Sequence, residues 1–190
     1  KEALTDLTAA LKSRKGQGDK LPQGIVKAVC NQITANIQAH DMVVVGLSCL
    51  TTVMSTPSRA GMILRVEGGI KVLTQVMKRH VERSKVAAPA LRLLLRASTN
   101  SPQTLLAVMK EKGCVPVLLD CFRIHLNDST IVSSCLELCV LMTRYEKGSR
   151  LLAGEQFVET CSQVMMAYVG QWDLFGSVLK TLKNMAKFEE

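Results

Sequence analysis

The stretch EGGIKVLTQVMKRH, residues 67–80, joins two adjacent glycines to an apolar run that begins directly after them. The apolar side chains of the run recur at the intervals of one helix face, and they are Ile70, Val72, Leu73, Val76 and Met77. Glycine interrupts regular structure, whereas this periodicity is typical of an amphipathic helix. The stretch therefore predicts a helix over 70–80 that starts at a glycine turn.

The same pattern occurs twice more, at a spacing of about 45 residues. Gly113-Cys114 leads into a second apolar run, and Gly24-Ile25 precedes an earlier one. A repeat of this length is typical of helical units that stack on one another to form a common core.

The composition supports a chain made of helices. Hydrophobic residues make up 47% of the 190 residues, but aromatic residues only 4%. A core of Leu, Val, Ala and Met suits close-packed helices better than a β-sandwich, so we expect an all-α fold. Because the chain begins at Lys1 without a methionine, we also expect it to be a fragment of a longer protein.

Seven cysteines, an odd number, lie within apolar runs, and no secretory signal precedes them. This usage predicts reduced thiols and a cytoplasmic or nuclear protein. The longest apolar stretch without a charge, 42–54, is too short to cross a bilayer. The cysteines are Cys30, Cys49, Cys114, Cys121, Cys135, Cys139 and Cys161.

The spacing predicts a single domain over 1–190 with about four three-helix units. We place the units at 24–57, 58–101, 102–145 and 146–190, and interpret 1–23 as the end of a preceding unit followed by a loop. The expected helices are 1–13, 24–39, 41–55, 58–66, 70–80, 85–98, 103–111, 115–126, 130–144, 147–153, 156–169 and 174–187. Asp41 and Ser58 are candidate N-caps, and Pro89 is expected in a first helical turn.

The longest helix of each unit carries a leucine at a matching position. These leucines are Leu47, Leu91, Leu136 and Leu179, and we expect all four to be buried.

Three segments carry a resemblance to the armadillo-repeat family: GGIKVL (68–73), GCVPVL (113–118) and TLKNMA (181–186). The resemblance extends from about residue 24 to the end of the chain. It implies a right-handed α-solenoid, an armadillo-like superhelix in which each unit has three helices. HEAT repeats are the nearest alternative, but their units have two helices and lack the glycine pair.

In the armadillo family, the third helices line a concave groove in which an Asn on each helix holds the backbone of an extended peptide. Here only Asn184 keeps that residue, and the corresponding positions hold Leu141, Arg96, Thr51 and Asp6. The tryptophan of importin-type proteins is also replaced, by Arg92 or Lys180 among others. These departures from the family pattern mean that the resemblance gives no support for importin-type recognition of nuclear localisation signals.

The groove that the resemblance implies is basic, and the chain has a net charge of +8. Guanidinium and ammonium groups suit carboxylates and phosphates, so we expect an acidic or phosphorylated segment of another protein as the partner. The chain would be a non-enzymatic scaffold or adaptor without a cofactor. The predicted partner-binding residues are Arg92, Arg96, Arg144, Lys180, Lys183 and Asn184.

Two other functions are compatible with the sequence. The basic surface could bind nucleic acid, although few aromatic residues are present to stack on bases. The chain could also be a structural or oligomerisation segment that associates through the exposed ends of its array.

Cysteines can also bind metal ions or act as nucleophiles. The pairs Cys121–His125 and Cys135–Cys139 have the four-residue spacing of helix cores rather than the spacing of zinc ligands. We therefore expect buried thiols, with neither a metal site nor a catalytic pair.

Overall fold

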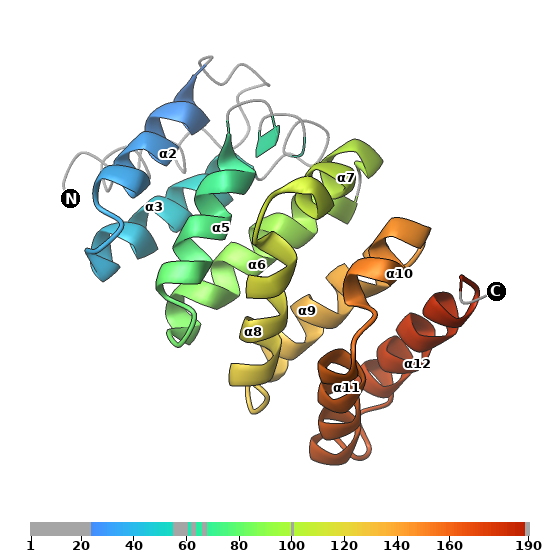
Figure 1. Ribbon diagram of the computed structural model, residues 1–190. Helices are drawn as coiled ribbons and strands as arrows, with labels where there is room; N and C mark the ends of the chain where they lie inside the picture. The colour runs from blue at the N-terminus through green and yellow to red at the C-terminus, as the bar shows by residue number, and fades with distance from the viewer. Residues whose placement is uncertain (1–23, 55–60, 62–63, 66–67, 100, 189–190) are drawn as a thin grey trace.

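The computed structural model of the chain describes residues 24–54, 61, 64–65, 68–99 and 101–188, and this part is all-helical (Figure 1). Within it there is no strand, and no helix is both long and apolar enough to cross a membrane. The helices are α2 (Ile25–Ala35), α3 (His40–Val53), α5 (Gly69–Arg79), α6 (Ser84–Thr99), α7 (Pro102–Lys110), α8 (Cys114–Ile124), α9 (Ser129–Met142), α10 (Glu146–Leu152), α11 (Glu155–Ala167) and α12 (Trp172–Ala186).

These helices coincide with the predicted ones to within a few residues at each end, which confirms the all-α expectation. The predicted helix at 1–13 lies outside the described residues, as does most of the one at 58–66 with its proposed cap Ser58. Two local predictions were wrong. Asp41 is not a cap, because α3 is preceded by Ala39 and Asp41 lies in its first turn. Pro89 lies in the second turn of α6, because that helix already begins at Ser84.

Three glycines in a left-handed conformation start three of the helices. Gly24, Gly68 and Gly113 have φ angles of 84°, 76° and 86° and directly precede α2, α5 and α8. Side chains disfavour this conformation, so glycine at these positions sets the same turn in each case. The spacing recognised in the sequence thus has a backbone cause. The turn before α11 differs, since Gly154 there is extended.

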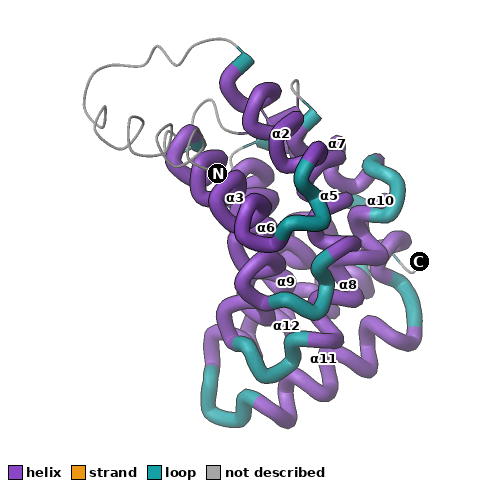
Figure 2. Tube along the Cα trace, turned by 90° about the vertical axis from the view of Figure 1, so that its left-hand side faces the viewer, coloured by secondary structure: helices purple, strands orange, loops and turns teal. Residues whose placement is uncertain are grey.

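The helices form two layers (Figures 1 and 2). One layer contains α2, α5, α8 and α11, and the other contains α3, α6, α9 and α12. Each helix packs against its neighbour in its own layer and against its partner in the other layer. The short helices α7 and α10 lie along one edge of the layers, where α7 contacts α6 and α8 and α10 contacts α9 and α12. We call α3, α6, α9 and α12 the third-helix layer.

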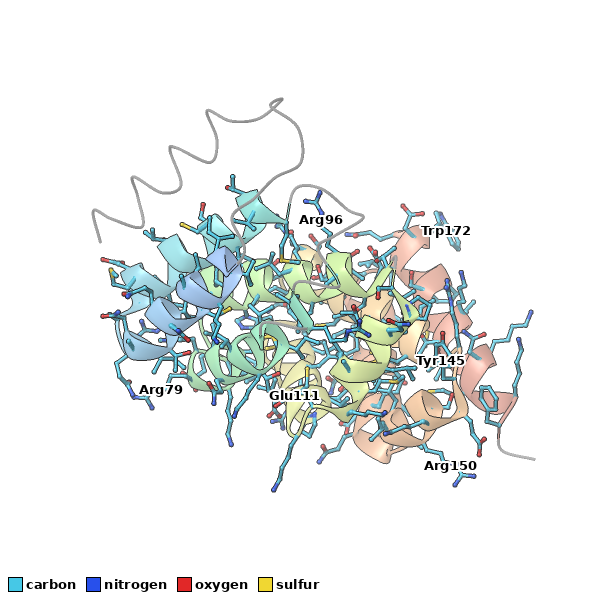
Figure 3. The ribbon with its side chains drawn as sticks, turned by 90° about the horizontal axis from the view of Figure 1, so that it is seen from above. Arg79, Arg96, Glu111, Tyr145, Arg150 and Trp172 are labelled. Carbon is cyan, nitrogen blue, oxygen red and sulfur yellow. The ribbon has the colours of Figure 1, made fainter. Side chains whose placement is uncertain are left out.

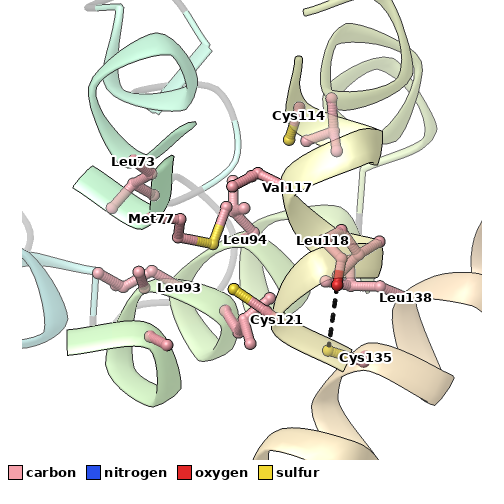
Figure 4. Close-up of a cluster of buried hydrophobic side chains, with 14 of the residues drawn as sticks. Leu73, Met77, Leu93, Leu94, Cys114, Val117, Leu118, Cys121, Cys135 and Leu138 are labelled. Carbon is pink, nitrogen blue, oxygen red and sulfur yellow. Dashed lines mark hydrogen bonds between the residues drawn. The ribbon is translucent and has the colours of Figure 1, made fainter. Parts of the chain in front are cut away.

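The core runs continuously between the layers (Figure 4). It is built of aliphatic and sulfur-containing side chains, with Met77, Leu94, Leu118, Cys121 and Leu138 among those in contact at its centre. No single pair of helices encloses this core, so the stability of each pair depends on its neighbours.

The four matching leucines do not share one environment. Leu47, Leu91 and Leu136 are fully buried, as expected. Leu179 is 49% exposed, so that prediction was wrong. Leu91 and Leu136 belong to α6 and α9, which each have a neighbouring helix on both sides within the third-helix layer. In the described part of the chain, α12 has only one such neighbour, α9.

Histidines join successive units by hydrogen bonds. Nε2 of His80, which follows α5, lies 2.7 Å from the carbonyl oxygen of Ile37. Nε2 of His125, which follows α8, lies 2.6 Å from the carbonyl oxygen of Val81. Because a carbonyl only accepts, Nε2 carries the proton and donates in both cases. Each ring therefore holds the turn of one unit to the turn of the preceding unit.

Replacing His125 by phenylalanine, which keeps a ring but removes the donor, is expected to destabilise the fold by about 1–3 kcal/mol. The carbonyl of Val81 would lose its partner in a half-buried position. Urea denaturation followed by circular dichroism measures the change. Arg123→Ala serves as the control, because Arg123 is exposed and makes only a surface ion pair with Asp120. An equal loss of stability in the two variants would show that the hydrogen bond from His125 does not stabilise the fold.

Candidate partner-binding surface

Two arginines project from α6. Arg92 is exposed and Arg96 is half-buried, and their spacing of four residues places them on one side of the helix. In Figure 3, Arg96 lies at one edge of the molecule, whereas Arg79, Glu111 and Arg150 lie at the opposite edge. The side of α6 that carries Arg96 is therefore the outer side of the third-helix layer.

The equivalent positions of α12 carry Lys180 and Asn184. Lys180 is exposed, and Asn184 is half-buried. Lys183 is exposed too, but it is rotated by about 60° from Lys180 around the helix axis. Lys183 therefore lies between the outer side of the third-helix layer and the side of α12 that faces away from α9.

The helix between them, α9, contributes fewer charges. The residue of α9 that corresponds to Arg92 is the exposed Glu137, which accepts a hydrogen bond of 3.2 Å from the hydroxyl of Ser133. Leu141, at the Arg96 position, is only 8% exposed. At these corresponding positions the side chains are thus basic on α6, acidic and apolar on α9, and basic or amide-bearing on α12.

Asn184 and Arg144 are brought together at the end of α9. Nδ2 of Asn184 donates a hydrogen bond of 3.4 Å to the hydroxyl oxygen of Thr143, the residue before Arg144. Arg144 itself is exposed. The structure therefore places Arg144 beside α12, although the two segments are 40 residues apart.

The dimensions of the surface suit an extended segment. Helices pack at about 8–10 Å, so α6 and α12, on either side of α9, are separated by about 16–20 Å. An extended chain covers that distance with about six residues. A bound segment of this length could reach the cations of both helices.

The cysteines of the two pairs lie in the core. All seven cysteines are buried. Burial raises the pKa of the Cys121 thiol to about 12, so it stays protonated at neutral pH. The imidazole of its sequence neighbour His125 is held by the carbonyl of Val81 instead. Among the described residues, no group of three or more His, Cys, Asp or Glu residues is arranged to hold a metal ion.

A shallow depression lies away from this surface, on α10. It is lined by Glu146, Lys147, Arg150 and Leu151, and the guanidinium of Arg150 is 2.5 Å from the carboxylate of Glu146. Arg150 is at the edge of the molecule opposite Arg96 (Figure 3). The depression is therefore not part of the basic surface.

One exposed feature was missed in the sequence. Trp172 falls between the helices predicted at 156–169 and 174–187, but it is the first residue of α12 and is 79% exposed. Its ring packs edge-on against Phe175, with the ring centroids 6.3 Å apart. The signal was present, because Trp172, Phe175 and Leu179 follow helical spacing on a side different from Leu174 and Val178.

Comparison of the chain with protein-family models, with curated proteins and with solved structures found no significant match.

Proposed function

We propose that the chain is an armadillo-like α-solenoid that acts as a non-enzymatic scaffold or adaptor. Its basic surface, formed by Arg92, Arg96 and Arg144 with the α12 side chains Lys180, Lys183 and Asn184, binds an acidic or phosphorylated extended segment of another protein. The observation that supports the proposal is that Arg96 lies on the outer side of the third-helix layer. On α12, the positions that correspond to Arg92 and Arg96 are Lys180, which is exposed, and Asn184. The buried, uncharged thiols suit a reducing compartment, the cytoplasm or the nucleus.

The distribution of charge suggests what the segment would look like. Carboxylates or phosphates near its two ends would meet the cations of α6 and α12. Its centre would lie over Glu137 and Leu141, where a further negative charge would be repelled. The preferred segment therefore has acidic ends and an uncharged centre, over about six to ten residues.

Reversing the charges of the surface is expected to weaken this binding at least about tenfold. Each exposed pair contributes up to about 1 kcal/mol, and reversal replaces attraction by repulsion. The variant is Arg92→Glu/Arg96→Glu/Lys180→Glu. Fluorescence anisotropy with twelve-residue peptides, acidic at both ends and with or without phosphoserine, measures the affinity at two salt concentrations.

The matched control is Lys71→Glu/Lys78→Glu/Lys112→Glu, which changes the net charge equally at exposed positions of α5 and of the turn before α8. Circular dichroism confirms that both variants are folded. Equal weakening in the two variants would mean that net charge alone attracts the peptide, and the proposal would fail. Tighter binding of single-stranded DNA or RNA than of any peptide, with a steep salt dependence, would favour the nucleic-acid alternative.

A further inference from the structure

Glu137 is an acidic residue in the middle of the basic surface. It is exposed on α9, and α9 packs between α6 and α12 in the third-helix layer. The residues at the corresponding positions of those two helices are Arg92 and Lys180, both exposed. A carboxylate therefore lies between two cationic helices.

The burial of nearby residues shows that the three helices present these charges on the same side. Two positions before each charged residue the side chain is fully buried, at Ala90, Cys135 and Val178. Two residues along a helix correspond to a rotation of about 200°, so a residue two positions after a fully buried one points nearly the opposite way. All three charges therefore lie on the outer side of the third-helix layer.

The carboxylate of Glu137 is held in place but not neutralised. The hydroxyl of Ser133, one turn earlier on α9, donates a hydrogen bond of 3.2 Å to Oε1. Among the residues that the structure describes, Glu137 forms no ion pair with Arg92, Arg96 or Lys180. A cation of a bound segment could therefore pair with this carboxylate.

The remaining charges on this side of the layer are more distant. They lie about two helical turns along the helices from the positions of Arg92, Glu137 and Lys180, and they are Lys85, Asp173, Arg144 and Lys187. Two turns correspond to about 10 Å. At that distance a charge contributes less than half of the Coulomb energy of a contact at about 4 Å, and salt reduces it further. The contact with Glu137 itself therefore decides which side chain is favoured at the centre of a bound segment.

The spacing of the helices determines the spacing of the complementary charges. Neighbouring helices pack at about 8–10 Å, a distance that an extended chain covers with about three residues. In the polyproline II conformation every third side chain returns to the same side after about 9 Å. Side chains three positions apart can therefore meet α6, α9 and α12 in turn.

We propose that the basic surface selects a segment of alternating charge. Acidic residues lie at its two ends, and a lysine or arginine, three positions from the nearest acidic residue on each side, pairs with Glu137. This inference rests on the function proposed for the surface and replaces the uncharged centre of the segment by a basic one. A uniformly anionic chain would place a negative charge over Glu137 and is disfavoured, because like charges across an interface oppose association.

Three fluorescently labelled peptides test the proposal. They share two glutamates at each end and differ only in a central residue, which is lysine, glutamine or glutamate and stands three positions from the nearest glutamate on each side. We expect the lysine peptide to bind about threefold tighter than the glutamine peptide and about tenfold tighter than the glutamate peptide. General attraction by the net charge of +8 predicts the opposite order, because the lysine peptide is the least negative of the three.

A charge reversal in the protein provides the second part of the test. Glu137→Lys is expected to reverse the order, so that the glutamate peptide binds tightest and the lysine peptide weakest. The matched control is Glu82→Lys, which changes the net charge equally at an exposed position between α5 and α6 and should keep the original order. Circular dichroism confirms that both variants are folded.

Two results would overturn the inference alone. One is an order of affinities that follows the net charge of the peptides, and the other is an order that Glu137→Lys leaves unchanged. In either case, binding that is weakened by Arg92→Glu/Arg96→Glu/Lys180→Glu but not by its control would still support the proposed function. No saturable binding of any of the three peptides up to about 1 mM would overturn both the inference and the proposed function.

Discussion

Replacement of Gly148 by alanine is expected to lower the free energy of unfolding by at least about 3 kcal/mol. A Cβ atom at Gly148 would overlap the carbonyl oxygen of Met142 and lie 2.5 Å from its carbonyl carbon. Both are backbone atoms at the end of α9, and Sδ of Met109 is only 3.1 Å away on another side. No rotamer change relieves such an overlap, so α10 would have to move away from α9. Thermal unfolding should show a decrease in Tm of about 6 °C or more.

Gly176→Ala is the matched control for this prediction. Gly176 lies within α12, and an added Cβ would meet nothing within 4 Å. Alanine favours helix over glycine, so this variant should gain about 0.5–1 kcal/mol. If Gly148→Ala were as stable as Gly176→Ala, this would contradict the close contact between α10 and the end of α9.

Alkaline pH is expected to destabilise the protein strongly. Burial raises the pKa of the thiols of Cys121 and Cys161 to about 12, whereas the pKa of an unfolded cysteine is about 8.5. Above pH 8.5 the unfolded chain loses these protons while the folded chain keeps them. Stability is therefore fully present below about pH 8.5 and falls as the pH rises towards 12. At pH 10 each thiol should lower the free energy of unfolding by about 2 kcal/mol relative to pH 7.

Urea denaturation between pH 7 and pH 10 measures this dependence. The variant Cys121→Ala/Cys161→Ala is expected to be less stable at pH 7, because it loses buried volume. Its stability should nevertheless decrease less with pH than that of the wild type, by about 4 kcal/mol over this range. Parallel pH profiles for the two proteins would show that these thiols are not buried in their protonated form.

Much of the secondary structure could be predicted because its causes are local. Gly68 and Gly113 mark turns that only glycine adopts easily, and the apolar spacing after each turn gives the helix that follows. Helix ends were less predictable. Asp41 is a favourable N-cap residue, but the chain starts α3 one residue earlier, at His40.

Contacts between units could not be derived in this way. The bonds from His80 and His125 join residues more than 40 positions apart, and the sequence offers only the recurrence of histidine after a helix. A histidine at the end of a helix interacts favourably with the helix dipole, and that alone would account for both residues. The carbonyl groups of the preceding unit that accept their hydrogen bonds are found only in the structure.

The position of Leu179 shows the limit of an argument from repeats. Matching positions need not have matching burial where a helix lacks a neighbour on one side. Leu136 lies in α9, between α6 and α12, whereas Leu179 lies in α12, whose described neighbour in that layer is α9. The helix α12 carries a second apolar stripe through Phe175 and Leu179, and this stripe is exposed although burial of Leu179 was expected. Two apolar stripes on one helix were visible in the sequence, and they indicate contact on two sides.

The most direct measurement of the central claim is an NMR experiment with a spin-labelled acidic peptide. The claim is that the outer side of the third-helix layer binds an acidic extended segment. The label should broaden amide signals of α6 and α12, around residues 88–99 and 176–187, and leave those of α5 and α8 sharp. Broadening centred on α5 and α8, or uniform weak broadening over the whole chain, would contradict the claim.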